Sequence, residues 1–191
     1  TSNDLKKEMK KYFNLKSVVH RQSLDIEGIK KKSKEKINFD FFKKYKHLKL
    51  INVGRLTDQK DLITLLKAFS KLLKIRKVRL LLIGNGSDQE KLKLFIKNEK
   101  VSNHVKIINF QSNPYKFISL ADVKILSSKY EGNPNILLEI ACIKKLIISS
   151  NCKVGPSEIL QDGKGGILFK VGDHNGLYNI LKNLKIKNKK I

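Results

Sequence analysis

The sequence has no tryptophan, one methionine, three prolines and two cysteines in 191 residues. It has no run of eighteen apolar residues and starts with mostly polar and charged ones, so it predicts neither a membrane-spanning helix nor a secretory signal. Cys142 and Cys152 stand ten residues apart with no Cys-x-x-Cys pair or histidine cluster, which argues against a zinc site or disulfide framework. We interpret both as buried or incidental thiols of a cytoplasmic protein.

Acidic residues and arginines are scarce beside lysine. Asp and Glu number 17 against 41 Lys and Arg, a formal net charge of +24 that points to an acidic partner. Nucleic-acid readers rely on arginine and on interleaved aromatic rings, whereas here lysines line the polar faces of amphipathic segments such as 91–97. We expect a solvated basic surface and no nucleic-acid partner. The arginines are Arg21, Arg55, Arg76 and Arg79.

Short apolar, β-branched runs alternate with longer amphipathic ones from about residue 48 onward. This alternation is typical of a parallel sheet covered by helices on both faces. The sequence therefore predicts an α/β, Rossmann-like fold of about six strands. The predicted strands are Lys49–Val53, Val78–Ile83, Val105–Ile108, Val123–Leu126, Leu146–Ser149 and Gly166–Phe169, and the predicted helices are about 60–74, 87–98, 114–120, 134–142, 156–161 and 174–184.

The two ends of the chain have a different pattern. Residues 4–13 and 26–36 are lysine-rich and helical in period, and Ser17–Ser23 between them fits a strand and a connector. We interpret residues 1–40 as the end of a preceding unit and a linker, 41–185 as one ligand-binding domain, and 186–191 as a basic tail. Because the first residue is Thr, we expect a processed, cropped or partial chain.

Candidate ligand-binding residues follow the predicted strands, where open parallel sheets bind their ligands. Gly54 and Arg55 follow the first strand, and Lys60 opens the next predicted helix. Two cations five positions apart can clamp a diphosphate and neutralise charge on it as a leaving group. Considered by itself, Lys60 is better explained as one more surface lysine than as a ligand-binding residue. Arg55 is a stronger candidate for ligand binding, because arginine is rare in this sequence.

A Gly-x-Gly turn, Gly84 to Gly86, follows the second predicted strand. Such a turn lets the backbone approach a ligand, but the full Gly-x-Gly-x-x-Gly fingerprint is absent. A tight turn with Ser87 or Asp88 as the helix N-cap explains the pattern equally well.

The stretch YEGNPNILLE, residues 130–139, joins structure breakers to a helical pattern. Asn133 suits an N-cap and Pro134 the first helical position, so we expect the helix to begin at Pro134. The amides of Asn135, Ile136 and Leu137 would then lie in its first turn, where the helix dipole is positive. This predicts an anion site.

Two carboxylates flank that helix start. Glu131 precedes the helix and Glu139 lies inside it, and at about 100° per residue they do not share a helical face. We expect separate contacts along one extended ligand, although a solvated helix glutamate fits the position of Glu139 equally well. The sequence has no Asp-x-Asp, P-loop or Gly-x-Ser-x-Gly motif, so we expect no metal.

Four segments in order resemble the donor-binding half of retaining GT-B glycosyltransferases of family 4, the glycosyl transferases group 1, over about residues 45–175. The frame from Glu131 to Glu139, with its embedded glycine and helix start, is the most specific part. The resemblance implies the C-terminal half of a GT-B fold. The segments are Gly54–Leu56 with Lys60, Leu82–Gly86, Ser127–Glu139 and Gly155–Leu160.

The resemblance also implies roles for individual residues. Arg55 and Lys60 would hold the diphosphate of a nucleotide sugar, and Glu131 would contact the transferred sugar near its anomeric carbon; these are the candidate catalytic residues. Glu139 would bind the ribose, and Phe110 and Gln111 would flank the base. The donor-binding residues would be Gly54, Gly84, Phe110, Gln111, Gly132, Asn133, Asn135, Ile136, Leu137 and Glu139.

The implied reaction is transfer with retention from a UDP-hexose or UDP-N-acetylhexosamine to a polysaccharide or lipid-linked glycan, without metal or other cofactor. The chain departs from the family at 143–146, where Gly-x-Pro is usual, at Asn151, where Asp is common, and at 18–22, where an Asn-Pro is expected. The amino-terminal acceptor domain is nearly absent, so we expect this chain to bind donor without transferring sugar.

Two other functions stay open at this point. A polybasic module for nucleic acid or anionic membrane would explain the charge, and peripheral contact with the inner face of the cytoplasmic membrane is compatible with an enzyme. An isomerase of UDP-sugars on a related double Rossmann fold is disfavoured by the shortage of catalytic acids and histidines.

Overall fold

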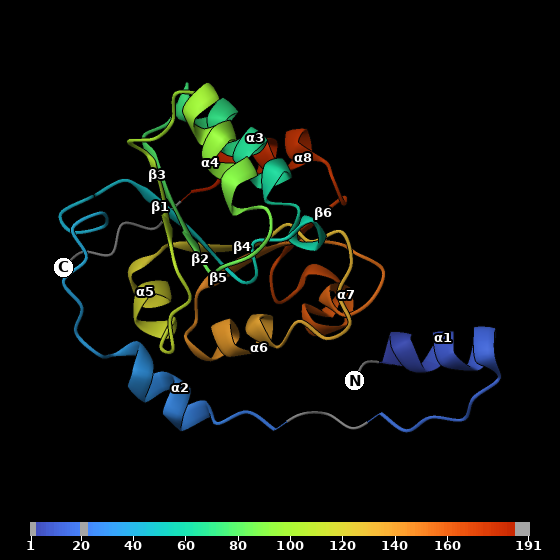
Figure 1. Ribbon diagram of the computed structural model, residues 1–191. Coiled ribbons are helices and arrows are strands. Elements are labelled where there is room, and N and C mark those ends of the chain that lie inside the picture. The colour runs from blue at the N-terminus through green and yellow to red at the C-terminus, as the bar shows by residue number, and fades with distance from the viewer. Residues whose placement is uncertain (1–2, 20–22, 186–191) are drawn as a thin grey trace.

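A six-stranded sheet forms the centre of the protein, in a computed structural model that describes residues 3–19 and 23–185 (Figure 1). All strand pairs are parallel, in the order β3-β2-β1-β4-β5-β6. The predicted α/β fold is confirmed. The strands are β1 Leu48–Val53, β2 Val78–Ile83, β3 Val105–Ile108, β4 Val123–Leu126, β5 Leu146–Ser150 and β6 Ile167–Phe169.

Helices cover both faces of the sheet, as predicted for strands that are almost entirely apolar (Figure 1). On one face α3 (Leu62–Leu73), α4 (Gln89–Asn98) and α8 (His174–Asn183) bury a large apolar cluster around Phe69. On the other, α5 (Tyr115–Leu120) and α6 (Asn135–Cys142) bury a second cluster. The sheet is therefore a layer buried on both faces.

Several predicted boundaries are wrong, and the helix expected at 60–74 differs most. It divides into a 3-10 turn, η1 (Asp58–Lys60), and α3, because Asp61 adopts a left-handed φ of 42° and caps α3. Its carboxylate accepts hydrogen bonds from the Thr64 hydroxyl at 2.7 Å and the Thr64 amide at 3.3 Å. Lys60 therefore ends a turn instead of opening a helix.

The helix expected at 156–161 is the short α7 (Pro156–Ile159), followed by η2 (Gln161–Gly163). The helical segment predicted at 26–36 ends three residues earlier, at Ser33, and the remaining differences are one or two residues at element ends. At α4, the side chain of Asp88 occupies the N-cap position without making a capping hydrogen bond.

The amino-terminal segment contains α1 (Asn3–Phe13) and α2 (Ile26–Ser33). Residues 17–19 form no strand; the rest of the expected connector, 20–22, and the tail 186–191 lie outside the described residues. The Asn113 amide donates to the Lys32 carbonyl at 3.1 Å and to Glu35 at 2.8 Å, so this segment packs beside α5. The domain boundary at residue 40 stays a prediction. Within the described ranges, no helix has both the length and the apolar character needed to span a membrane.

Candidate functional site

The loops after β1 and β4 lie side by side at the carboxyl edge of the sheet, because β1 pairs with both β2 and β4. The connections run outward in opposite directions from this position, which makes it the topological switch point of the sheet. Open α/β proteins bind ligands in the crevice at such a point.

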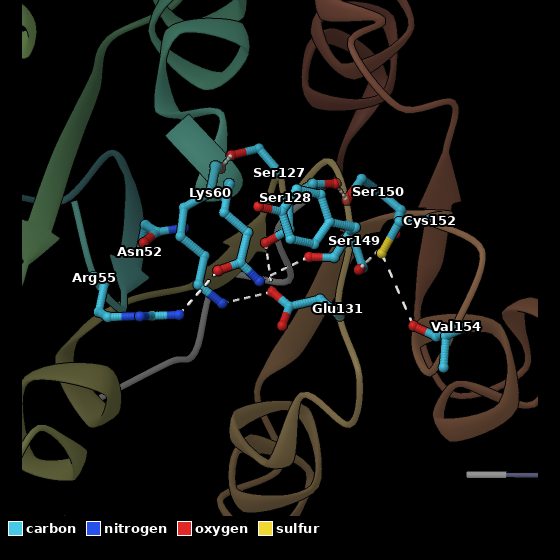
Figure 2. Close-up of polar contacts among 12 residues, drawn as sticks. Asn52, Arg55, Lys60, Ser127, Ser128, Glu131, Ser149, Ser150, Cys152 and Val154 are labelled. Atoms are coloured by element: carbon cyan, nitrogen blue, oxygen red, sulfur yellow. Dashed lines mark hydrogen bonds and ion pairs between the residues drawn. The ribbon is translucent and has the colours of Figure 1, made fainter. Parts of the chain in front are cut away.

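An ion pair joins the two loops across this switch point (Figure 2). The Lys60 Nζ lies 2.6 Å from Glu131 Oε1, and the Ser128 hydroxyl donates to the same oxygen at 2.5 Å. The Lys60 and Glu131 side chains are 15% and 7% exposed. Short contacts to one oxygen leave the second carboxylate oxygen of Glu131 for another partner. The sequence indicated both residues but not that they pair.

Arg55 lies beside this pair, with its side chain exposed. Its Nη2 donates to Gln59 Oε1 at 2.9 Å, and Gln59 Nε2 donates to the Tyr130 carbonyl at 3.0 Å. The Lys129 amide donates to the Gln59 carbonyl at 2.8 Å. Gln59 therefore connects the loops after β1 and β4. Sequence reasoning did not identify Gln59, because a single glutamine belongs to no recognisable motif.

Buried serines link the two loops to β5 by hydrogen bonds (Figure 2). The Ser127 hydroxyl donates to the Lys60 carbonyl at 2.8 Å, and that of Ser150 donates to the Ser128 carbonyl at 2.7 Å. Ser149 donates to the Ser150 carbonyl at 3.0 Å. Buried hydroxyls need such partners, and these link β5 and the β4 loop to Lys60.

Cys152 lies near Glu131, in the loop that follows β5 (Figure 2). Burial, followed by the negative charge of Glu131, raises the pKa of its thiol to about 11, while backbone hydrogen bonds and the positive charge of Lys60 act in the opposite direction. The thiol is therefore protonated near neutral pH and is a poor nucleophile. This agrees with the interpretation of Cys152 as a buried or incidental thiol.

The Gly-x-Gly turn packs against the loop after β1. A side chain at Gly84 would place its Cβ 2.0 Å from the Gly54 carbonyl, and one at Gly86 would place it 2.2 Å from the Leu56 carbonyl. The Leu56 amide donates to the Asn85 carbonyl at 2.9 Å. The close contact between the Gly84–Gly86 turn and the loop after β1 therefore requires both glycines. This contact holds the backbone that carries Arg55 in place.

The start of α6 corrects one expectation. The helix begins at Asn135, with Pro134 at the capping position, and Asn133 donates to the Asn135 side chain at 2.9 Å instead of capping. The Asn135 amide bonds the Asn133 carbonyl at 2.8 Å and the Leu137 amide bonds the Pro134 carbonyl at 2.9 Å. Within the described structure, this leaves Ile136 as the predicted anion-binding amide that has no hydrogen bond of its own.

The segment that carries α7 supports the same helix start. Gly155 has a φ of +96°, and a Cβ there would lie 2.6 Å from Pro134 Cδ and 3.4 Å from the Gly132 carbonyl oxygen. Only glycine suits this left-handed, crowded position. Two of the four motifs are therefore in direct contact, and exposed Gly132 lies at their junction.

Glu139 has a different partner from Glu131. The Tyr115 hydroxyl of α5 hydrogen-bonds its carboxylate, and burial, followed by Glu139 itself, raises the pKa of Tyr115 to about 12. As expected from their spacing, the two acids do not form a pair. Sequence reasoning also missed Tyr115, which interacts with Glu139 from the neighbouring helix.

Phe110 and Gln111 follow β3, two strands away from β1. The Phe110 ring is 72% exposed while its amide donates to the Asn85 side chain at 3.2 Å. The Gln111 side chain donates to the Asn109 carbonyl at 3.2 Å. These residues share the carboxyl edge with the Lys60–Glu131 pair but do not touch it through any described hydrogen bond.

No cluster of three or more His, Cys, Asp or Glu side chains that could hold a metal ion occurs among the described residues. Independence from metal stays a prediction, because the diphosphate of a donor can itself supply metal ligands.

Known proteins resemble this chain in sequence. A glycosyltransferase of Methanocaldococcus jannaschii is 36% identical over 111 residues, which cover 58% of this chain and 27% of that protein. A Campylobacter jejuni enzyme, N-acetylgalactosamine-N,N'-diacetylbacillosaminyl-diphospho-undecaprenol 4-alpha-N-acetylgalactosaminyltransferase, is 26% identical over 85% of this chain and 42% of its own length. The chain thus spans less than half the length of either relative.

Solved structures share the fold. A glycosyltransferase from Rickettsia africae superposes with a TM-score of 0.81 at 20% identity, over 94% of this chain and 50% of that one. S. aureus TarM gives a TM-score of 0.69 at 21% identity, over 73% and 28%. Residues 33–190 match the family described as Glycosyl transferases group 1. The chain therefore belongs to that family, and its sheet is the carboxyl-terminal half of a GT-B fold.

Proposed function

We propose that this chain is the donor-binding part of a retaining, metal-independent glycosyltransferase that uses a UDP-hexose or UDP-N-acetylhexosamine. The observation that carries the proposal is the Lys60–Glu131 pair at the switch point, beside the exposed cation of Arg55. Two cations and a carboxylate together suit a ligand with a diphosphate at one end and a polar sugar at the other. UDP is present in structures of TarM and of Anabaena HepE, which share the fold.

Arg55 and Lys60 would bind the diphosphate and neutralise the charge that develops on it as the sugar leaves. A lysine ammonium has three N–H donors, so Lys60 can bond Glu131 and a phosphate oxygen at the same time. Glu131 would hold the sugar near its anomeric carbon and stabilise positive charge there. We assign it a positioning and electrostatic role during transfer with retention.

The nucleoside would lie along the same edge toward β3. Glu139, oriented by Tyr115, would accept hydrogen bonds from the ribose hydroxyls, while the exposed ring of Phe110 would stack on the base. The proposed donor-binding set is Gly54, Gly84, Phe110, Gln111, Gly132, Asn133, Asn135, Ile136, Leu137 and Glu139.

Calorimetric titration of the chain with UDP and UDP-sugars tests the proposal. Arg55→Ala and Glu139→Ala should each weaken UDP binding at least about tenfold, as expected for loss of a charge-assisted contact. Exposed Lys93→Ala and Glu90→Ala on α4 are the matched controls and should leave affinity unchanged. Titration with excess chelator should give the same affinity. Absence of binding, or equal affinity in all four variants, would reject the assignment.

The acceptor is a separate proposal. We propose a polysaccharide or lipid-linked glycan on the cytoplasmic side of the membrane, supported by the diphospho-undecaprenol in the name of the Campylobacter relative and by the net charge of +24. Lysines are attracted to the anionic inner leaflet by about 1 kcal/mol each near the surface. Binding to anionic but not to neutral vesicles, reversed by salt, is the expected result, and binding to nucleic acid with no UDP affinity would favour a polybasic module instead.

Because the chain spans 42% of the Campylobacter relative, we propose that these 191 residues bind donor without transferring sugar. An assay with radiolabelled UDP-sugars and undecaprenyl-linked acceptors should show no product. Sugar transfer by this chain alone would refute this part of the proposal.

A further inference from the structure

Gln59 joins the two loops of the proposed site through three hydrogen bonds. Its side-chain oxygen accepts from Arg55 Nη2 at 2.9 Å, and its side-chain nitrogen donates to the Tyr130 carbonyl at 3.0 Å. Its backbone carbonyl accepts from the Lys129 amide at 2.8 Å. One half-buried residue of η1 therefore contacts both the arginine that follows β1 and the two residues that precede Glu131.

The hydrogen-bond partner of Arg55 is a neutral amide. In the described part of the chain no carboxylate forms an ion pair with Arg55, whereas Lys60 is paired with Glu131 at 2.6 Å. Asp58 of the same turn bonds Lys129 instead, also at 2.6 Å. An amide takes one N–H donor of the guanidinium and leaves its charge and its other donors for phosphate oxygens, whereas a carboxylate would neutralise it. Arg55 is therefore a held but uncompensated cation.

The two side-chain contacts of Gln59 require an amide. A guanidinium only donates and a backbone carbonyl only accepts, so the group between them must accept at one end and donate at the other. An ionised glutamate donates nothing, a lysine accepts nothing, and a methionine does neither. The Tyr130 carbonyl belongs to the planar peptide unit that carries the Glu131 amide, so this contact also sets the direction in which the chain enters Glu131.

We propose that Gln59 is a positioning residue: its side-chain amide holds the Arg55 guanidinium at the diphosphate end of the donor and the peptide of Glu131 at the sugar end. The inference rests on the proposed function of this site, and adds that one side chain sets the separation of its two ends. The backbone bond from Lys129 does not involve the Gln59 side chain, and the Lys60–Glu131 pair joins the same loops. Substitution of Gln59 should therefore alter donor binding more than folding.

Calorimetric titration with UDP tests the contact with Arg55. Gln59→Met keeps the length of the side chain without its hydrogen bonds, and should weaken UDP binding about threefold to tenfold because the guanidinium is no longer held. In an Arg55→Ala background the same substitution should change the affinity less than about twofold, because Gln59 acts through Arg55. Gln89→Met, at the first residue of α4, is the matched control and should leave the affinity unchanged.

The outcomes separate this inference from the proposed function. If wild type does not bind UDP, the proposed function is wrong and the inference falls with it. If wild type binds UDP and Arg55→Ala weakens binding, but Gln59→Met does not, the inference alone is wrong. Equal losses from Gln59→Met in the presence and absence of Arg55 would also overturn it, because Gln59 would then act by another route.

Nuclear magnetic resonance without donor tests the two contacts one by one. In wild type the Arg55 guanidinium should rotate slowly, and Gln59→Met should speed this rotation and shift the resonance of the Tyr130 carbonyl carbon. Gln59→Glu should keep Arg55 restrained and change Tyr130 alone, because a carboxylate accepts but does not donate. A guanidinium that rotates equally fast in wild type and Gln59→Met would overturn the inference even where UDP affinity falls.

Discussion

The two faces of the sheet use β4 in different ways. Toward α3, α4 and α8 the strand presents Val123 and Ile125 to a cluster whose members are all apolar. Toward α5 and α6 it presents Lys124 and Leu126, and the cluster there ends at the polar loop that carries Glu131. The α3 face carries no buried charged side chain among the described residues, although α3 buries the polar Thr64 and Ser70, whereas the α6 face also holds the charged side chain of Lys124. Substitutions on the two faces should therefore respond differently to volume, charge and pH.

Removal of volume on the α3 face should give the largest effect. Phe69→Ala truncates a ring with 0% exposure in the centre of the apolar cluster and should cost about 3–5 kcal/mol in the free energy of unfolding. The cost should not change between pH 6 and pH 9, because no charge is involved. Denaturant unfolding measures it, with exposed Lys67→Ala on the same helix as control. If the cost of Phe69→Ala depended strongly on pH, the α3 face would not differ from the α6 face in its response to charge.

Removal of charge at the edge of the α6 face should come next. Lys60→Met leaves the buried carboxylate of Glu131 with the Ser128 hydroxyl, and should cost about 3 kcal/mol, at the lower end for breaking a buried pair. The double variant with Glu131→Gln should recover most of the loss. Lys129→Met, which breaks the exposed pair with Asp58, should change stability little. Equal losses for both lysines would show that burial adds nothing at Lys60.

The sequence predicted the α3 face almost fully and the α6 face only in part. Apolar periodicity alone predicts that Phe69 lies in a core. The same periodicity also predicts the succession of strands and helices along the chain. The Lys60–Glu131 contact spans 71 positions, so it depends on the strand order, which periodicity does not encode. The same applies to Gln59 and Tyr115, whose partners are distant in sequence. The start of α6 was wrong by one residue because the side chain of Asn133 bonds Asn135 rather than the helix.

Lys124→Met should stabilise the protein, whereas Phe69→Ala and Lys60→Met should destabilise it. Burial lowers the pKa of Lys124 from 10.5 to about 7, so between these values the unfolded chain binds more protons than the folded one. The free energy of unfolding of wild type therefore rises with pH over this interval. At pH 6 the variant should be more stable than wild type, and this advantage should shrink as the pH rises toward 10. Urea unfolding at several pH values measures the difference, and a constant difference would contradict a buried charge.

The smallest effect should come from the Tyr115–Glu139 contact, where the α6 face meets α5. Tyr115→Phe removes one hydroxyl from a half-buried position and should cost about 1 kcal/mol in the free energy of unfolding, with a small loss of UDP affinity because Glu139 is less fixed. Glu139→Gln should lower the Tyr115 pKa below about 12, but not to 10, because burial is the larger cause of the shift and persists. The ultraviolet difference spectrum between wild type and Tyr115→Phe isolates this phenol during a pH titration. If the Tyr115 pKa stays near 12 in Glu139→Gln, the carboxylate does not act on the ring. The difference between the faces would then reduce to Lys60, Lys124 and Glu131.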